Sequence, residues 1–217
     1  GDGVVGEKDV SGGGAYTHMT MWAKDSEGLH NLFRLSSLAS YEGYYMKPRM
    51  DRELMGQYPG GIIASTGCPS GEVQTRLRLG QFEEACQAAS DYRDIFGREN
   101  YFCELMDHGV PIEKQVRSDL LKLAKKLDIP LLVTNDSHYV TEDQADAHDS
   151  LLCVGVGRNK DDPNRFRFNG SGYYIKSSEQ MRALFPDHPE ACDNTLLLTE
   201  MIGSYDEVFK YVDRMPQ

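Results

Sequence analysis

The alternation of short apolar runs with segments of helical periodicity constrains the fold of this chain most. Three runs rich in branched or aromatic residues occupy 62–66, 101–106 and 129–133. In 81–96 and 112–127, which lie between them, apolar side chains recur every three or four positions, as in amphipathic helices. Because strands that alternate with crossover helices build parallel sheets, the sequence predicts an α/β fold with a parallel sheet, open or closed into a barrel.

The same signals predict the remaining elements. Residues 15–23 alternate like a strand, and 26–41 have the spacing of a helix with a glycine after it. Further helices are expected at 51–57, 72–79, 141–154, 178–185 and 189–202, a polar linker at 157–163 and a short strand at 172–176. Residues 1–14 are rich in glycine and predict a lead-in loop, so we expect the chain to start inside a larger protein.

Charge limits the classes of partner that this chain can bind alone. The 217 residues contain 34 acidic and 23 basic side chains, which gives a formal net charge of −11. A protein that holds nucleic acid phosphates by itself normally presents basic patches. If DNA is the substrate, metal ions or neighbouring domains must therefore supply the positive charge.

Cysteine usage and hydropathy indicate the compartment. The five cysteines are scattered and form no Cys-x-x-Cys pair, a pattern that suits a reducing cytosol. No apolar stretch approaches the ~18 residues of a membrane span, and the start lacks the pattern of a signal peptide. The sequence therefore predicts a cytoplasmic protein without a membrane partner.

The most informative local pattern is Asp136-Ser137-His138, which directly follows the apolar run 129–133. In an extended chain, residues two apart point to the same face, so Asp136 and His138 would direct an oxygen and a nitrogen ligand toward one point. Such a pair suits Zn²⁺ or Mn²⁺. The alternative is structural, with Asp136 capping the next turn and His138 satisfied by hydrogen bonds.

Two further residues carry ligand chemistry near predicted strands. His18 lies within 15–23, where a packed histidine is the simpler interpretation. Cys68 follows the strand at 62–66 and is flanked by Gly67 and Gly71. Its thiol is either a nucleophile with a lowered pKa, a soft metal ligand or a small buried group.

Other polar residues receive weaker predictions. Glu104, Asp107 and His108 end the third strand, and we expect them near the substrate or behind the metal ligands rather than on the metal. His148 is expected to be a surface histidine. Arg165, Arg167 and Lys176 are basic residues that either meet DNA or form a solvated surface.

Five strings of the sequence closely resemble the PHP domain (polymerase and histidinol phosphatase) of bacterial replicative DNA polymerase III alpha subunits, with the actinobacterial ones most similar. The strings occupy 18–23, 28–37, 66–72, 104–109 and 134–140, in the order and spacing of that family. The resemblance implies an α/β fold that is an incomplete distorted (β/α)7 barrel over 15–176. It also implies an exit toward the polymerase palm over 177–217.

The resemblance also implies a function. PHP domains hydrolyse phosphoesters at a Zn²⁺ or Mn²⁺ cluster, and within these DNA-directed DNA polymerases the domain serves as a 3′–5′ proofreading exonuclease. The family's ligand motifs match His18, Cys68, Asp136 and His138, which favours ligation by Cys68 over nucleophilic attack. DNA, the sliding clamp and other replisome subunits are the implied partners, and Mg²⁺ would serve the polymerase site that this sequence lacks.

The sequence departs from the family in one respect. The family's opening His-x-His strand, the Asp after it and a further His and Glu have no counterparts here. We therefore expect this chain by itself to bind metal weakly and to cleave DNA poorly. Two alternatives stay open, a non-catalytic module that supports the polymerase core and a free-standing PHP phosphatase.

Overall fold

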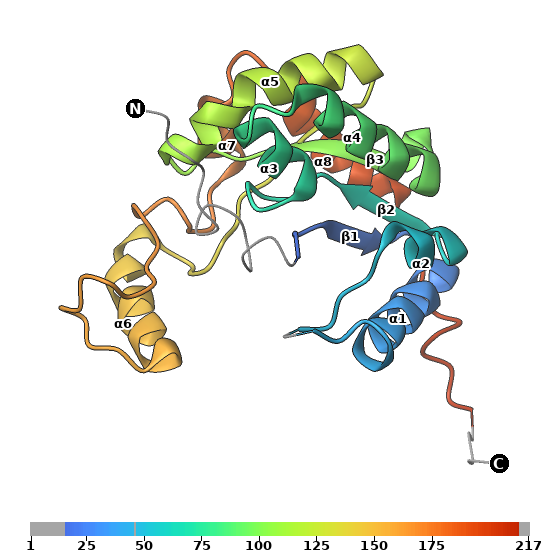
Figure 1. The fold of residues 1–217 in the computed structure, drawn as a ribbon, viewed down its shortest axis with the longest axis horizontal. Coiled ribbons are helices and arrows are strands. Elements are labelled where there is room, and N and C mark those ends of the chain that lie inside the picture. The colour runs from blue at the N-terminus through green and yellow to red at the C-terminus, as the bar shows by residue number, and fades with distance from the viewer. Residues whose placement is uncertain (1–15, 46, 213–217) are drawn as a thin grey trace.

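A four-stranded sheet with helices packed against it forms the body of the protein in a computed structural model that describes residues 16–45 and 47–212 (Figure 1). The strand order is β1-β2-β3-β4. The strands are β1 (Thr20–Ala23), β2 (Ile62–Ser65), β3 (Tyr101–Leu105) and β4 (Leu131–Val133). The mixed α/β class is confirmed; the strands of the described part form this open sheet, and a seven-stranded barrel is not seen there. The predicted lead-in at 1–14 lies outside the described residues.

Eight α-helices accompany the sheet in the described part of the chain. They are α1 (Ser26–Tyr41), α2 (Arg52–Gln57), α3 (Glu72–Arg78), α4 (Phe82–Phe96), α5 (Pro111–Leu127), α6 (Ala145–Val156), α7 (Ser178–Leu184) and α8 (Pro189–Met201). Short 3₁₀ turns occupy Arg98–Asn100 and Glu142–Gln144. None of the helices among residues 16–45 and 47–212 is long and apolar enough to cross a membrane.

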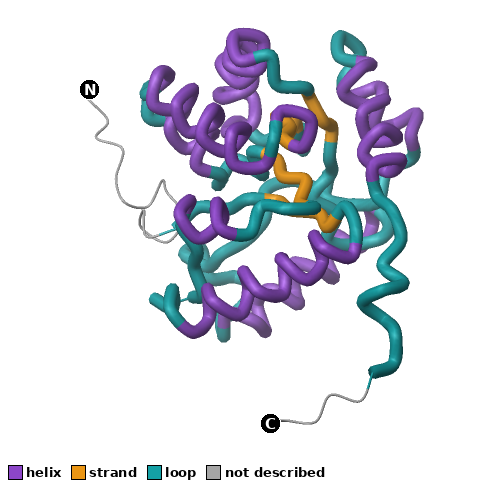
Figure 2. The backbone as a smooth tube through the Cα atoms, turned by 90° about the vertical axis from the view of Figure 1, so that its right-hand side faces the viewer, coloured by secondary structure: helices purple, strands orange, loops and turns teal. Residues whose placement is uncertain are grey.

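Alternating side chains of the strands supply two apolar layers. Ile62, Ala64 and Tyr101 belong to the main core, to which α3, α4 and α5 contribute. On the opposite face, Ile63 and Phe102 pack with Leu198 of α8. The strands therefore lie between helices, as continuously apolar strands require (Figure 2). Helix α6 stands apart from the sheet (Figure 1).

The prediction of an all-parallel sheet is wrong for β1. Strands β2, β3 and β4 run parallel, whereas β1 pairs antiparallel with β2. Helices α1 and α2 lie between β1 and β2 in the chain, and the end of β1 meets the start of β2. The backbone N–H of Lys24 donates to the carbonyl of Gly61 (2.7 Å), which places the end of β1 beside the start of β2.

The short strand predicted at 172–176 is also not formed. Only an isolated bridge between Tyr139 and Tyr174 is present there. The carbonyl of Tyr174 instead accepts hydrogen bonds from the side chains of Asn135 (2.6 Å) and Ser137 (3.3 Å). These bonds add to backbone bonds from the His138 N–H to the Tyr173 carbonyl (2.7 Å) and from the Ile175 N–H to the Val140 carbonyl (3.3 Å).

Candidate metal centre

The candidate ligands lie at one edge of the sheet. Because β2, β3 and β4 are parallel, the loops that follow them begin at the same edge. The antiparallel β1 starts at this edge, so His18, which precedes it, lies there too. The backbone N–H of His18 donates to the carbonyl of Ser70 (3.1 Å), and His18 forms a bridge with Gly71.

His18 and Cys68 form the first pair of candidate ligands. The Cys68 Sγ lies 3.5 Å from the His18 Nδ1. Gly67, with a φ of +75°, lets the chain turn out of β2 so that Cys68 faces His18. Burial raises the pKa of the Cys68 thiol, and the charges of Asp136 and Glu104 raise it further, while hydrogen bonds to Ser70 lower it. This direction argues against a nucleophile with a lowered pKa.

Asp136 and His138 form the second pair, after β4. The His138 Nδ1 lies 2.8 Å from the backbone oxygen of Asp136 and 3.8 Å from its carboxylate Oδ1. A carbonyl oxygen only accepts, so Nδ1 carries the proton and the Nε2 of the neutral ring keeps its lone pair. Both side chains are exposed. The predicted pair is therefore accessible, with a nitrogen lone pair available to a metal ion.

The two pairs are neighbours without forming one group. The charge of Asp136 acts on the Cys68 thiol, which places that carboxylate within electrostatic reach of the first pair. Across residues 16–45 and 47–212, however, no three His, Cys, Asp or Glu side chains come close enough to hold a metal ion together. The donor types suit Zn²⁺ or Mn²⁺, but a complete centre requires further ligands.

Glu104 lies behind both pairs at the centre of the sheet. It is buried, and its carboxylate accepts hydrogen bonds from the hydroxyls of Ser65 at the end of β2 and Thr134 (2.5 Å) after β4. Its backbone N–H donates to the hydroxyl of Thr66 (2.9 Å). The Gln74 amide donates to that hydroxyl (2.9 Å) as well. This buried network fixes the strand ends from which the ligand loops start.

Asp107 points to α5. The Arg117 guanidinium donates to its carboxylate (2.8 Å), and so does the backbone N–H of Gly109 (2.9 Å). Burial opposes the charged form most strongly, but the bonds from Arg117 and Gly109 and the charges of Arg117 and Lys114 together outweigh it, so the pKa of Asp107 lies below its ordinary value. Asp107 anchors the start of α5.

His108 is buried against the same helix. Its Nδ1 lies 2.5 Å from the Glu113 carboxylate, which also accepts the backbone N–H of His108 (2.6 Å). The His108 ring stacks on Tyr173, with centroids 4.2 Å apart, and the Tyr173 ring lies edge-on to His138, at 6.0 Å. His108 thus touches a neighbour of the candidate ligand His138.

His148 is not the surface residue that the sequence predicted. It is half-buried, and its ring lies 5.4 Å from that of His138 and 5.2 Å from that of Phe168. Phe168 also contacts His138 at 4.6 Å. The wrong prediction arose because residues 166–173 fold back over α6, which helical periodicity cannot show.

The basic residues near the C-terminal part differ from one another. Arg165 is buried and forms two bonds to Asp149, of 2.7 and 2.6 Å, so the surface role suggested for it is wrong. The Lys176 ammonium donates to Asn135 (3.1 Å) and to the carbonyl of Gly172. Arg167 is exposed. Only Arg167 keeps the character of a solvated basic residue.

Sequence reasoning missed the polar residues that support the ligand loops, namely Ser65, Thr66, Gln74 and Thr134. A signal was available for two of them. Ser65 and Thr66 end an otherwise apolar run, and Glu104 interrupts the next one. Because buried polar groups need hydrogen-bond partners, such groups in neighbouring buried strands are expected to bond to each other.

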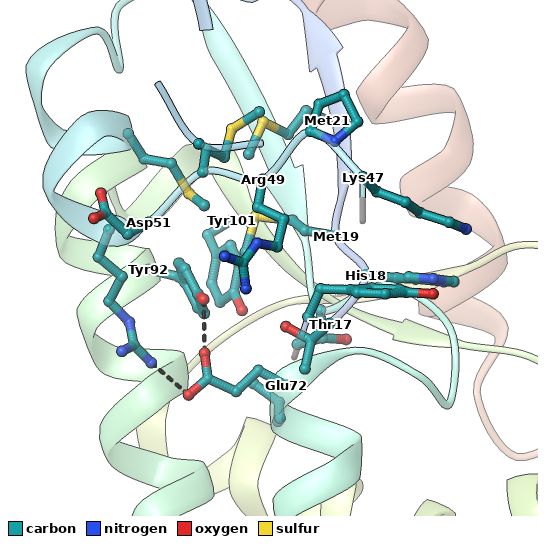
Figure 3. Close-up of a pocket in the computed structure, with 18 residues that line it drawn as sticks. Thr17, His18, Met19, Met21, Lys47, Arg49, Asp51, Glu72, Tyr92 and Tyr101 are labelled. Carbon is teal, nitrogen blue, oxygen red and sulfur yellow. Dashed lines mark hydrogen bonds and ion pairs between the residues drawn. The ribbon is translucent and has the colours of Figure 1, made fainter. Parts of the chain in front are cut away.

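A cavity of about 890 Å³ opens beside the first pair, between β1, α2 and the helices α3 and α4 (Figure 3). His18 and Met19 line one side of it, and Tyr92 and Tyr101 another. Within it, Glu72 accepts hydrogen bonds from the Tyr92 hydroxyl (2.7 Å) and from Arg52 (2.8 Å). The cavity thus combines an apolar wall with a charged network.

Comparison with known proteins gives matches that agree with one another. Residues 4–108 match the PHP domain. The chain is 62% identical over 210 residues to the DNA polymerase III subunit alpha of Saccharopolyspora erythraea, covering 96% of this chain and 18% of that protein. The corresponding protein of Mycobacterium tuberculosis is 57% identical over the same shares.

More distant relatives carry the same name. The DNA polymerase III subunit alpha of Treponema pallidum is 44% identical over 188 residues, which are 87% of this chain and 16% of the relative. The chain spans less than a fifth of the length of the curated relatives that it matches.

Proposed function

We propose that this chain, whose residues 4–108 match the PHP domain, is part of a DNA polymerase III alpha subunit and contributes a metal-dependent phosphoesterase site to it. The site acts as a 3′–5′ exonuclease that removes mismatched ends during DNA synthesis in the cytoplasm. One observation carries this proposal. The pairs His18 with Cys68 and Asp136 with His138 lie at the same edge of the sheet, with the Asp136 charge acting on Cys68.

The donor set fits a zinc or manganese site that draws its remaining ligands from outside the described residues. An imidazole, a thiol, a carboxylate and a second imidazole are the groups that bind these ions. A bound cation would supply positive charge at the scissile phosphate and lower the pKa of a water molecule. This positive charge would offset, at the site, the negative net charge of the chain.

The residues of the chain supply the positioning. The bond from His138 Nδ1 to the Asp136 carbonyl fixes the tautomer that leaves Nε2 available. Ser65 and Thr134, joined through Glu104, hold the ends of β2 and β4 at a fixed separation. The Cys68 and Asp136 loops therefore start from a rigid base, which a phosphoester site needs for precise placement.

In the full-length protein we propose that the four strands form part of a distorted (β/α)7 barrel and that residues 177–217 lead toward the polymerase palm. Primer-template DNA, the sliding clamp and other replisome subunits are the partners under this proposal. The polymerase site itself would lie in other parts of the protein and use Mg²⁺.

The experiment compares exonuclease activity of the full-length polypeptide with and without Asp136→Asn, on primers with a mismatched 3′ end. Loss of a ligand should lower the rate by at least about 10-fold. Asp119→Asn, which changes an exposed carboxylate paired with Lys122 on α5, is the matched control and should keep the rate. If Asp136→Asn removed mismatched ends as fast as Asp119→Asn and the unaltered polypeptide, catalysis at this site would be ruled out.

A second candidate is a non-catalytic module that supports the polymerase core. The absence of a three-ligand group from the described residues favours it. Under this alternative, Asp136→Asn leaves exonuclease activity unchanged. Mutations of the buried core lower polymerase activity because they destabilise the fold that supports the polymerase core.

A further inference from the structure

The segment 172–176 holds the loop that carries Asp136 and His138. The carbonyl of Tyr173 accepts the backbone N–H of His138 (2.7 Å) and that of Tyr139 (3.3 Å). Both bonds join backbone atoms, so the position of the loop depends on the position of Tyr173.

The side chain of His138 lies among aromatic rings. The Tyr173 ring is edge-on to it, with centroids 6.0 Å apart, and the Phe168 ring lies 4.6 Å from it. Tyr173 and Phe168 also contact each other, at 4.7 Å. These rings limit the rotation of the imidazole, while the bond from its Nδ1 to the Asp136 carbonyl (2.8 Å) fixes the tautomer. The orientation that leaves Nε2 available therefore depends on Tyr173.

His108 and Glu113 hold Tyr173 from the side of α5. The His108 ring stacks on the Tyr173 ring, with centroids 4.2 Å apart and an angle of 9° between the planes. Since a carboxylate only accepts, Glu113 takes one hydrogen bond from the His108 Nδ1 (2.5 Å) and another from the His108 backbone N–H (2.6 Å). Both side chains are buried, with 1% and 5% of their surface exposed. A buried ring that is bonded in this way has little freedom to move, so it gives Tyr173 a fixed support.

Burial distinguishes His108 from the candidate ligands. One face of its ring lies on Tyr173, and Gly172 packs so closely that an added Cβ would lie 3.3 Å from the His108 Cα. The His138 side chain, by contrast, is 34% exposed. A metal ion at the exposed edge of the sheet therefore meets His138, and His108 acts on that ligand only through Tyr173.

We propose that the buried pair of His108 and Glu113 positions the candidate ligand His138, through the ring and the carbonyl of Tyr173. The two residues are positioning residues, because they touch neither the metal site nor a substrate. The role of His138 as a ligand rests on the proposed function, whereas the orientation of its ring can be measured without metal.

The test measures two properties of the full-length polypeptide. The first is zinc affinity, determined by competition with a chromogenic chelator. The second is the rate at which diethyl pyrocarbonate modifies His138 after metal has been removed, determined by peptide mass spectrometry relative to His30. His30 contacts Phe33 on the same helix, α1, so it reports general loosening of the fold.

His108→Leu removes the ring that stacks on Tyr173. It should lower zinc affinity by about 10-fold, the lower end of the loss seen when partners of metal ligands are changed. Since His138 is 34% exposed, release of its ring should raise the relative rate of modification by up to about threefold. His108→Phe keeps a ring against Tyr173 and should restore most of both properties, although it loses the Nδ1 bond to Glu113.

Two further variants separate positioning from stability. Val116→Ala removes methyl groups of α5 within the main core, so it destabilises the same helix but should leave zinc affinity and the relative rate unchanged. Glu113→Gln keeps the shape of the buried pair but has one oxygen for two donors. It should shift both properties in the direction of His108→Leu by a smaller factor, and it decides the proposal if His108→Leu does not fold.

Equal effects of His108→Leu and Val116→Ala would overturn the proposal, since they would show a role in stability alone. A His108→Phe protein that behaves like His108→Leu would overturn it as well, because the stacked ring would not matter. If the full-length polypeptide bound no zinc, the proposed function would fail, and the modification rate of His138 would still decide whether His108 positions it. If Asp136→Asn lowered zinc affinity and His108→Leu did not, only the positioning role would be wrong.

Discussion

At the scale of single residues, Glu104 is the group through which the two ligand loops are joined. Its carboxylate accepts from Ser65 on one side and Thr134 on the other, and all three groups lie at the carboxyl ends of neighbouring strands. The sequence predicted candidate ligands but not this support. His18 and Asp136 are candidates by residue type and position, whereas the Ser65 and Thr134 contacts depend on strand register.

The substitution Glu104→Gln tests this support. Both hydroxyls donate to the Glu104 carboxylate, but the glutamine amide has only one oxygen, so its NH₂ group would face one of them. One buried polar group then has no partner, and the free energy of unfolding should fall by about 1–3 kcal/mol. Urea denaturation measures the change. Glu53→Gln, on the exposed side of α2, should change it by less than about 0.5 kcal/mol. A similar loss in both variants would show that the buried bonds are not responsible.

Asp107 predicts a pH dependence of stability. Its pKa is held below the ordinary value of 3.8, because the bonds from Arg117 and Gly109 and the nearby positive charges together outweigh burial. A carboxyl group with a lowered pKa stabilises the folded state above its unfolded pKa, and this contribution disappears as the pH falls through the folded pKa. Asp107→Asn should therefore flatten the fall in unfolding free energy as the pH drops below about 4. An unchanged slope, with Asp119→Asn as reference, would contradict the assignment.

At the scale of elements, the contact between the start of α1 and the start of β2 determines the antiparallel pairing of β1. A Cβ on Gly28 would lie 1.8 Å from the carbonyl oxygen of Gly61, so the two backbones touch directly. The Asn31 amide donates to the carbonyl of Gly60 (2.9 Å) beside this contact. Local periodicity predicted nearly every helix, but strand direction depends on such contacts between distant residues, which no local pattern contains.

Gly28→Ala and Gly56→Ala form a matched pair of helix substitutions. The first forces the backbones apart and should cost about 1–3 kcal/mol of unfolding free energy, as overpacking does. Gly56 in α2 has no atom within 4 Å of an added Cβ, so alanine there should stabilise the protein by about 0.5–1 kcal/mol. Thermal and urea denaturation of both variants check the prediction, and a stable Gly28→Ala protein would show that α1 can move away from β2.

At the scale of the whole molecule, the proposed function requires a metal centre that is divided between the described residues and other parts of the protein. The sheet edge brings two pairs of donors together, yet no three of them form a group within residues 16–45 and 47–212. The absence of a His-x-His strand from the sequence leads to the same expectation, which stays a prediction. Metal affinity should therefore depend on how much of the polypeptide is present.

The last prediction concerns Zn²⁺ affinity, measured by competition with a chromogenic chelator. Two donors hold zinc far less firmly than the usual four, so the full-length polypeptide should bind it at least about 100-fold more tightly than the 217-residue chain. Cys68→Ser should weaken binding by the full-length protein, because it removes the soft ligand paired with His18. Cys86→Ser changes a buried cysteine of α4 within the main core, away from the candidate ligands, and should leave the affinity unchanged. If both polypeptides held zinc equally well, the two pairs would suffice as a centre, and the requirement for ligands from outside the described residues would be wrong.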